Sequence, residues 1–434
     1  MPGRKVDLAV QTFFARRETR QWLVVAILLL CMIIVAGPTY SVYAVFFTPL
    51  LKEFHFTRAQ LSSLSGALFL SLGLSAPVIG WLLDRVDAKF VAITGTSLCV
   101  AGFILAGRAH SLGALLVAHL FMGVGVAAGV NFTTPYVVAN WFGARRGTAL
   151  GVAFVGLALG PMSMTILANR LLSAFGWRDG YFLLAIPMLA IALPLQLVFI
   201  RSRPPWGVDD AAPVVPGGSG APEGSPPPLS PGLEVGEALA ARSFWLIAFT
   251  NFFFGFATTS LSVHVIPYLI SIGYKPGSAA LAMGITFGFA AVGNVFFGWL
   301  GDKVRSRFAL SASLAGIALA VLLLLGAAAI PALAVFIVIY GIAHQGPVFG
   351  VPLTIAESLG LRRFGSLSGL IGFVSTLAGS LGPVAAGRLF DATGSYRAPF
   401  TMFLVSLIIA TLLPLGCLPL AQAAAGEPRM AAAH

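Results

Sequence analysis

GWLLDRVDAK occupies residues Gly80–Lys89, and a related stretch, GWLGDKVRSR, occupies Gly298–Arg307, 218 residues later. Each stretch ends a long apolar run and places an Asp beside cationic residues. The same offset pairs Gly37 with Gly255, Pro49 with Pro267, Gly123 with Gly341, Gly147 with Gly365, Gly151 with Gly369, Arg170 with Arg388 and Gly176 with Gly394. Glycine pairs are common in a chain with 49 glycines, so the Asp, Arg, Trp and Pro pairs are the informative ones. The sequence therefore predicts two copies of one unit in the same orientation.

Apolar runs flank both stretches. Of the 434 residues, 58% are hydrophobic and only 9% are charged, whereas charged residues make up about 25% of soluble domains. A run of about 20 apolar residues can cross the hydrocarbon core of a bilayer as a helix. We predict an all-α membrane protein with twelve transmembrane helices in two parallel six-helix repeats. The expected spans are 22–47, 60–82, 90–107, 112–139, 148–171, 180–200, 244–270, 279–300, 308–329, 332–356, 366–389 and 397–419.

Positive charge gathers in the short loops between these spans. Most of the 26 Lys and Arg residues fall on the side that holds the N-terminus, so the positive-inside rule places both termini in the cytoplasm. The net charge of +11 follows from this topology, and no nucleic-acid partner is expected. We expect a multi-pass protein of the cell membrane, with the lipid bilayer as its solvent.

Five regions follow from the span pattern. Residues 1–21 form a cytoplasmic N-terminal tail, and residues 421–434 form a cytoplasmic C-terminal tail. Residues 22–200 and 244–420 form the two six-helix bundles. Between them, residues 201–243 contain the run PVVPGGSGAPEGSPPPLSPG, whose composition predicts a flexible cytoplasmic linker.

GWLLDRVDAK resembles the G-x-x-x-D-R-x-G-R-K signature of the major facilitator superfamily, with Asp87 where that signature has Gly. Four other segments are similar to its monocarboxylate and oxalate/formate transporter branch: Tyr40–Gln60, Trp141–Gly160, Gly176–Arg178 and Phe364–Tyr396. The resemblance implies the major facilitator fold and alternating access to a central site. An Asp at a helix end can accept hydrogen bonds from a neighbouring helix N-terminus. We interpret Asp84, Arg85, Asp302 and Lys303 as a cytoplasmic gate; the alternative is a solvated topogenic loop.

This chain differs from that branch at residues that are expected to contact the substrate. The resemblance leads one to expect an Arg in the eighth span and an Asp four residues before it, but this chain has Asn294 and Ala290. The Lys expected in the first span of monocarboxylate carriers, or in the eleventh span of oxalate carriers, is also missing. No intramembrane cation is left to pair with a carboxylate, so the substrate class of the branch does not transfer directly.

In the implied fold the first, fourth, seventh and tenth spans surround the substrate pathway. Their mid-span polar residues are the candidates, together with Asn294 of the eighth span, which can keep part of the hydrogen-bonding role of the missing Arg. The seventh span offers one helical stripe, since its polar residues recur every three or four positions. Helix packing is the alternative for the stripe, and interfacial anchoring is the alternative for the tyrosines. The candidates are Tyr40, Tyr43, Asn131, Thr134, Asn251, Thr258, Ser262 and Asn294.

His344 is the ionisable residue expected nearest to mid-membrane, with Tyr340 and Gln345 as hydrogen-bond partners. An imidazole titrates near physiological pH, which makes His344 the candidate for proton coupling. The alternative is a neutral histidine that hydrogen-bonds between helices. Arg170 and Arg388 end their spans at the outer mouth, where they anchor the helix ends or attract an anionic substrate.

The leading hypothesis is a secondary active transporter for a small organic anion, a mono- or dicarboxylate, driven by a proton or a counter-substrate and functional as a monomer. An exporter of neutral or amphipathic molecules is the alternative, and a transporter-like receptor is a third reading. The sequence lacks paired intramembrane carboxylates, metal-ligand spacing and nucleophile motifs, so we expect no enzyme, no metal and no cofactor.

Overall fold

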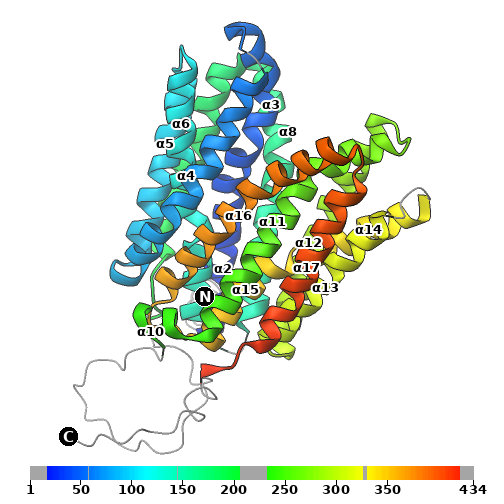
Figure 1. The fold of residues 1–434 in the computed structure, drawn as a ribbon. Coiled ribbons are helices and arrows are strands. Elements are labelled where there is room, and N and C mark those ends of the chain that lie inside the picture. The colour runs from blue at the N-terminus through cyan, green and yellow to red at the C-terminus, as the bar shows by residue number, and fades with distance from the viewer. Residues whose placement is uncertain (1–16, 57, 144, 206–231, 326–329, 421–434) are drawn as a thin grey trace, which may run out of the picture. The chain divides into compact units, whose positions relative to one another are not determined.

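The computed structural model describes residues 17–56, 58–143, 145–205, 232–325 and 330–420, and helices make up nearly all of this part (Figure 1). Within these ranges the β pairing consists of a single bridge between Gly232 and Gly360. The α-helices are α2 (Arg17–Cys31), α3 (Gly37–Phe54), α4 (Arg58–Arg85), α5 (Ala88–Gly107), α6 (Leu112–Val126), α7 (Thr133–Trp141), α8 (Arg146–Pro187), α9 (Leu193–Phe199), α10 (Val235–Ala240), α11 (Arg242–Ser271), α12 (Pro276–Lys303), α13 (Ser306–Leu325), α14 (Ile330–Ala343), α15 (Gly346–Ser358), α16 (Phe364–Thr393) and α17 (Arg397–Leu412). The π-helical segments η1 (Met32–Ala36), η2 (Ala127–Asn131) and η3 (Met188–Ala192) join neighbouring α-helices, and the 3-10 turn η4 (Leu413–Gly416) follows α17.

Eleven helical segments of the described residues are long and apolar enough to cross a membrane. One of them, Arg146–Phe199, has 54 residues and would be about 80 Å long if straight, far more than a hydrocarbon core of about 30 Å requires. It breaks at Gly176, whose φ of 79° lies in the left-handed region that favours glycine. The break yields two crossings, 146–175 and 177–199, and so the twelve expected spans. The all-α membrane fold is therefore confirmed.

The chain divides into two compact units. Of the described residues, those up to 79 and from 85 to 205 form the first, and those from 80 to 84 and from 232 onward form the second. Aromatic residues of α3, α5 and α8 fill the core of the first unit: Phe46 and Phe103 lie edge-on to the fully buried Tyr181, at centroid distances of 4.9 and 5.8 Å. Edge-to-face packing adds to the energy of apolar burial. This core holds the first unit together by contacts between residues far apart in sequence.

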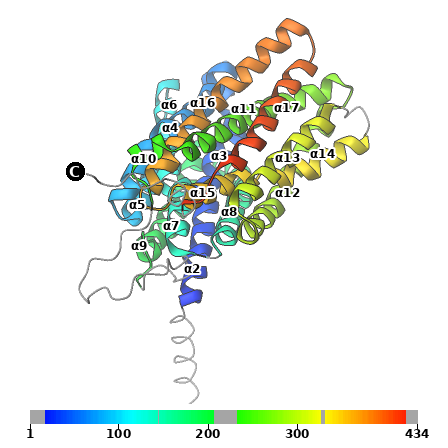
Figure 2. The same cartoon turned by 60° about the horizontal axis from the view of Figure 1, so that its bottom comes forward.

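The second unit has its own core. Tyr268 of α11 lies 4.7 Å from the ring of Phe400 of α17 and donates a hydrogen bond of 2.8 Å to the carbonyl of Leu324 in α13. Helix α11 also packs along α16, and α12, α13 and α14 lie side by side in both views (Figures 1 and 2). Large apolar side chains such as Leu281, 65% exposed, cover the outside, as expected for a surface that faces lipid.

The expected linker at 201–243 is structured at its C-terminal end. Helix α10 begins at a capping box in which Glu234 and Glu237 satisfy each other's backbone N–H groups. The Glu234 carboxylate also pairs with Arg362 at 2.9 Å and with Arg363 at 2.7 Å. Composition alone did not reveal these contacts, because the partners lie about 130 residues away in sequence. Residues 206–231 of the expected linker lie outside the described residues, as do both terminal tails apart from 17–21.

Candidate functional site

Tyr40 and Asn131 meet in the first unit. Asn131 ends η2, and its side-chain N–H donates a 2.6 Å hydrogen bond to the hydroxyl of Tyr40. The Tyr40 ring stacks on Phe69 with a centroid distance of 5.9 Å. The Tyr43 side chain lies outside the described part of the structure. The structure thus brings one candidate from the first span together with one from the fourth.

Two polar atoms, one on Asn131 itself and one on Thr134, are buried without a hydrogen bond to any described residue. They are Asn131 Oδ1 and Thr134 Oγ1. Thr134 is completely buried in α7, two residues after Phe132, which separates η2 from α7. A buried polar group without a partner costs about 1–3 kcal/mol. The Thr134 hydroxyl can donate a hydrogen bond to a polar ligand, whereas Asn131 Oδ1 can only accept one.

The polar side chains of the α11 stripe form hydrogen bonds within the second unit. Thr258 donates to the Phe254 carbonyl at 2.8 Å, and Ser262 donates to the Thr258 carbonyl at 2.9 Å. Asn251 donates to the Ile371 carbonyl of α16 at 3.2 Å. The Thr258 and Ser262 hydroxyls therefore form their hydrogen bonds within α11, and Asn251 links α11 to α16. Both arrangements fit the alternative in which the stripe serves helix packing.

The tenth span is broken at its candidate residues. Helix α14 ends at Ala343, His344 and Gln345 form a turn, and α15 starts at Gly346. The imidazole of His344 lies 5.2 Å from the Tyr340 ring and 5.7 Å from the Phe254 ring, and it makes no side-chain hydrogen bond to a described residue. The hydrogen-bond partners expected for His344 are thus replaced by aromatic contacts.

Three of the four expected pathway spans are interrupted in mid-course. The first span contains η1 immediately before α3, the fourth contains η2, and the tenth contains the turn at His344. A fourth interruption, η3, lies in the sixth span. Such breaks occur often at functional sites of membrane transporters, because they free backbone groups near the ligand. Tyr40, Asn131 and His344 all lie within about one helical turn of a break.

Asn294 is buried in α12, with 1% of its surface exposed. The neighbouring Gly293 lies so close to α14 that an added Cβ would be 2.2 Å from the carbonyl oxygen of Ile342. The position where the resemblance leads one to expect Arg is therefore buried in α12, and its neighbour Gly293 touches α14 two residues before His344.

Asp84 accepts three hydrogen bonds at the start of α16. Its carboxylate receives the backbone N–H groups of Gly365 and Ser366, each at 2.8 Å, and the Ser366 hydroxyl at 2.6 Å. Gly80 makes this approach possible, since a Cβ there would lie 2.1 Å from the Gly365 carbonyl oxygen. The negative carboxylate thus neutralises the positive end of the α16 dipole.

The other gate candidates differ from Asp84 in exposure. Arg85 and Lys303 are exposed, and Asp302 is partly buried. The structure adds Glu357, whose carboxylate receives the N–H of Ser306 at 3.1 Å and its hydroxyl at 2.7 Å at the start of α13. Glu357 was not predicted from the sequence, although a carboxylate at the end of a span is a visible signal.

Glu53, Trp177 and Arg178 form a cluster that was not predicted from the sequence either. Arg178 pairs with Glu53 at 2.8 Å and donates to the Ala109 carbonyl at 2.8 Å, and the Trp177 indole N–H donates to Glu53 at 2.5 Å. The Trp177 hydrogen bond, helped by Arg178, lowers the pKa of the Glu53 carboxyl. The Gly176–Arg178 motif pointed to this place, but nothing in the sequence linked it to Glu53. Arg170 and Arg388, expected at the outer mouth, are both exposed.

The sequence profile of the Major Facilitator Superfamily matches residues 28–383 and 247–433. The chain belongs to the major facilitator superfamily. Among curated proteins, this superfamily member is 27% identical to rat monocarboxylate transporter 12, over 73% of this chain and 71% of that protein. It is 27% identical to rat monocarboxylate transporter 13, over 88% and 85% of the two chains. It is 25% identical to the Bacillus subtilis protein "Uncharacterized MFS-type transporter YcxA", over 81% and 84%.

Solved structures agree on the fold. The superfamily transporter FucP in its outward conformation matches with a TM-score of 0.71 at 16% identity, covering 91% of this chain and 99% of FucP. The human organic anion transporter MFSD10 matches with a TM-score of 0.70 at 15% identity, covering 91% and 99%. The protein is thus a membrane transporter that resembles the monocarboxylate branch, and it is not an enzyme.

Proposed function

We propose that this transporter moves a small organic anion, a mono- or dicarboxylate, across the cell membrane by alternating access. The observation that carries the proposal is the polar centre of the first unit, where Tyr40 and Asn131 pair beside the buried Thr134 hydroxyl. Hydroxyl and amide N–H groups can donate hydrogen bonds to a carboxylate without an intramembrane cation. The similarity to monocarboxylate transporters 12 and 13 supports the same substrate class.

A proton or a counter-substrate would balance the charge of the anion. His344 is the candidate for the proton, because it lies at the break between α14 and α15 and its imidazole makes no side-chain hydrogen bond to a described residue. Protonated, it would supply the cation that the branch places elsewhere. The anion and the proton would then load together without net charge. Both termini lie in the cytoplasm in this proposal, and the monomer is the working unit.

The gate of this transporter includes Asp84. Its three hydrogen bonds join the end of α4 to the start of α16, and they must break if these helix ends separate during the transport cycle. Arg85, Asp302 and Lys303 complete the gate at the two copies of the signature. The gate controls how fast the protein switches state, and substrate contacts lie elsewhere.

Transport of a neutral or amphipathic molecule is the second candidate. It is favoured by the uncharged residues Asn294 and Ala290 at the positions where the branch carries charge. Moving an uncharged substrate into an uncharged pathway costs less free energy than moving an anion there, because no ion must be desolvated.

Counterflow in proteoliposomes separates the two candidates. Vesicles loaded with unlabelled lactate, pyruvate, oxalate or formate should accumulate the labelled acid, and lipophilic dyes should not compete. Asn131→Ala should abolish this accumulation, and Asn169→Ala, an exposed amide on α8, is the matched control. Dye transport without carboxylate counterflow would establish the second candidate. Specific binding without flux of any substrate would indicate a receptor.

A further inference from the structure

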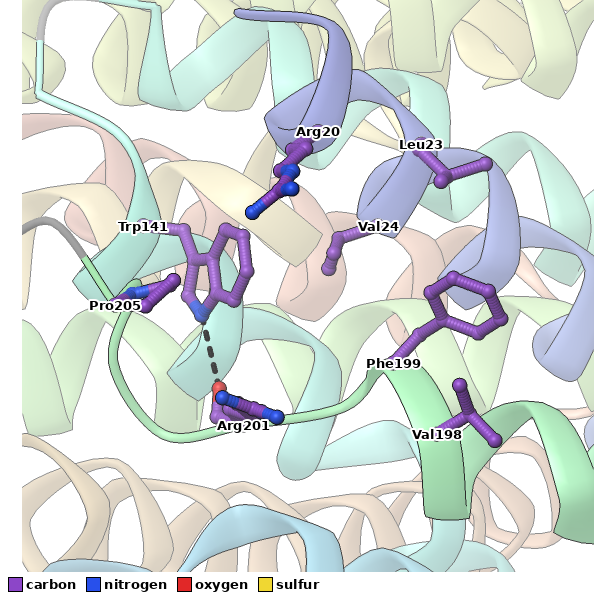
Figure 3. Close-up of a pocket in the computed structure, with 8 residues that line it drawn as sticks. All are labelled: Arg20, Leu23, Val24, Trp141, Val198, Phe199, Arg201 and Pro205. Carbon is purple, nitrogen blue, oxygen red and sulfur yellow. Dashed lines mark hydrogen bonds between the residues drawn. The ribbon is translucent and has the colours of Figure 1, made fainter. Parts of the chain in front are cut away.

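A cavity of about 430 Å³ opens in the first unit (Figure 3). Three membrane-spanning segments begin or end beside it: Arg17–Phe47 begins there, and Leu112–Trp141 and Arg146–Phe199 end there. The first span starts on the same side of the membrane on which the fourth and sixth spans finish. The cavity therefore lies at the boundary between the hydrocarbon core and the water on that side. Its lining residues are Arg20, Leu23, Val24, Trp141, Val198, Phe199, Arg201 and Pro205.

The lining combines an apolar wall with two guanidinium groups. Figure 3 shows Arg20 extending from α2 toward Trp141, with Arg201 below the indole. The polar atoms of the wall are already used: the Trp141 indole donates to the Arg201 carbonyl at 2.8 Å, and Gln21 donates to the Trp141 carbonyl at 2.8 Å. The described residues that line the cavity include no Asp or Glu. Its chemistry therefore suits a ligand that is anionic at one end and apolar at the other.

We propose that this cavity binds an anionic phospholipid of the adjacent leaflet. The lipid phosphate lies between Arg20 and Arg201, and an acyl chain runs over Val198 and Phe199. The apolar surface continues outward from the cavity, since Leu197 and Val198 are 56% and 60% exposed. Basic pockets between transmembrane helices are suited to bind lipid headgroups. A small soluble anion would leave the apolar wall in contact with water, so the wall favours a lipid.

Native mass spectrometry of the purified protein tests the site. Phosphatidylglycerol should remain bound at collision energies that remove phosphatidylcholine with the same acyl chains. Arg201→Gln should weaken phosphatidylglycerol binding about fivefold, since one cation near the membrane surface contributes roughly that factor. Arg203→Gln is the matched control, because Arg203 follows two residues later on the same loop and does not line the cavity. This control should bind phosphatidylglycerol as the native protein does.

A second variant separates a lipid site from a free-anion site. Val198→Trp fills the apolar wall and leaves both guanidinium groups, so it should also lose phosphatidylglycerol, and an unchanged melting temperature confirms its folding. Inorganic phosphate added in excess should not displace the lipid. The proposal is overturned if both phospholipids bind equally, if neither variant changes lipid retention, or if inorganic phosphate competes as well as the lipid.

Discussion

Replacing Asp84 by Asn tests the gate most directly. The asparagine keeps one oxygen, which can still accept from Gly365, but it places an NH₂ group where the carboxylate now receives the N–H and hydroxyl of Ser366. It also removes the negative charge from the start of α16. The substitution therefore weakens the hydrogen bonds that hold these two helix ends together.

The magnitude follows from these contacts. A hydrogen bond to a charged group contributes about 1.5–3 kcal/mol, and a charge at a helix terminus contributes about 0.3–1 kcal/mol. The loss is therefore about 2–4 kcal/mol in the state that contains these bonds. Since about 1.4 kcal/mol corresponds to a factor of ten, the equilibrium between that state and one without the bonds shifts by roughly 30-fold to several hundred-fold.

Two measurements check this expectation in proteoliposomes and in detergent. Asp84→Asn should slow flux strongly and change equilibrium substrate binding by no more than about fivefold, which corresponds to about 1 kcal/mol. Asp391→Asn is the control, because it makes the same change at an exposed carboxylate near the other end of α16. The gate interpretation is refuted if Asp84→Asn abolishes substrate binding while the switching rate, followed by a fluorophore on either unit, stays at the native value.

Three further outcomes are expected. Asn294→Arg should preserve or tighten carboxylate binding if the substrate is an anion, whereas an unpaired intramembrane cation costs several kcal/mol and should abolish transport of a neutral substrate. His344→Gln keeps size and hydrogen bonding but cannot charge, so uptake measured against external pH should lose its proton dependence. Glu53→Gln should lower thermal stability at neutral pH. Because the folded-state pKa of Glu53 lies below its usual 4.5, its stabilising contribution is present above pH 4.5 and disappears as the pH falls through the folded pKa.

A specific result would contradict each of these three expectations. A folded Asn294→Arg protein that loses carboxylate uptake argues against an anionic substrate. If the His344→Gln variant keeps the native pH dependence of uptake, His344 has a structural role and another group carries the proton coupling. For Glu53, the melting temperatures of the native and variant proteins should converge at acidic pH, and a constant difference at every pH would show that Glu53 does not act through its charge.

The sequence alone determined the membrane class, the repeat and the superfamily, because these depend on local composition and on spacing along the chain. The length of the apolar runs specified the spans, and the two copies of the signature at one offset specified the repeat. Even the break at Gly176 could be anticipated, since a glycine stands between two adjacent apolar runs. Such features require no knowledge of which residues meet in space.

Only the tertiary structure decided which polar side chains are partners. Tyr40 and Asn131 are 91 residues apart in sequence, and Glu53 and Arg178 are 125 residues apart, so no local pattern could pair them. The same holds for Glu234 and Arg363, which order a stretch that composition assigned to a linker. In a chain with few charged residues, each such pair forms where helices distant in sequence pack together. Their identity therefore depends on the packed fold, because burial makes an unpaired polar group costly.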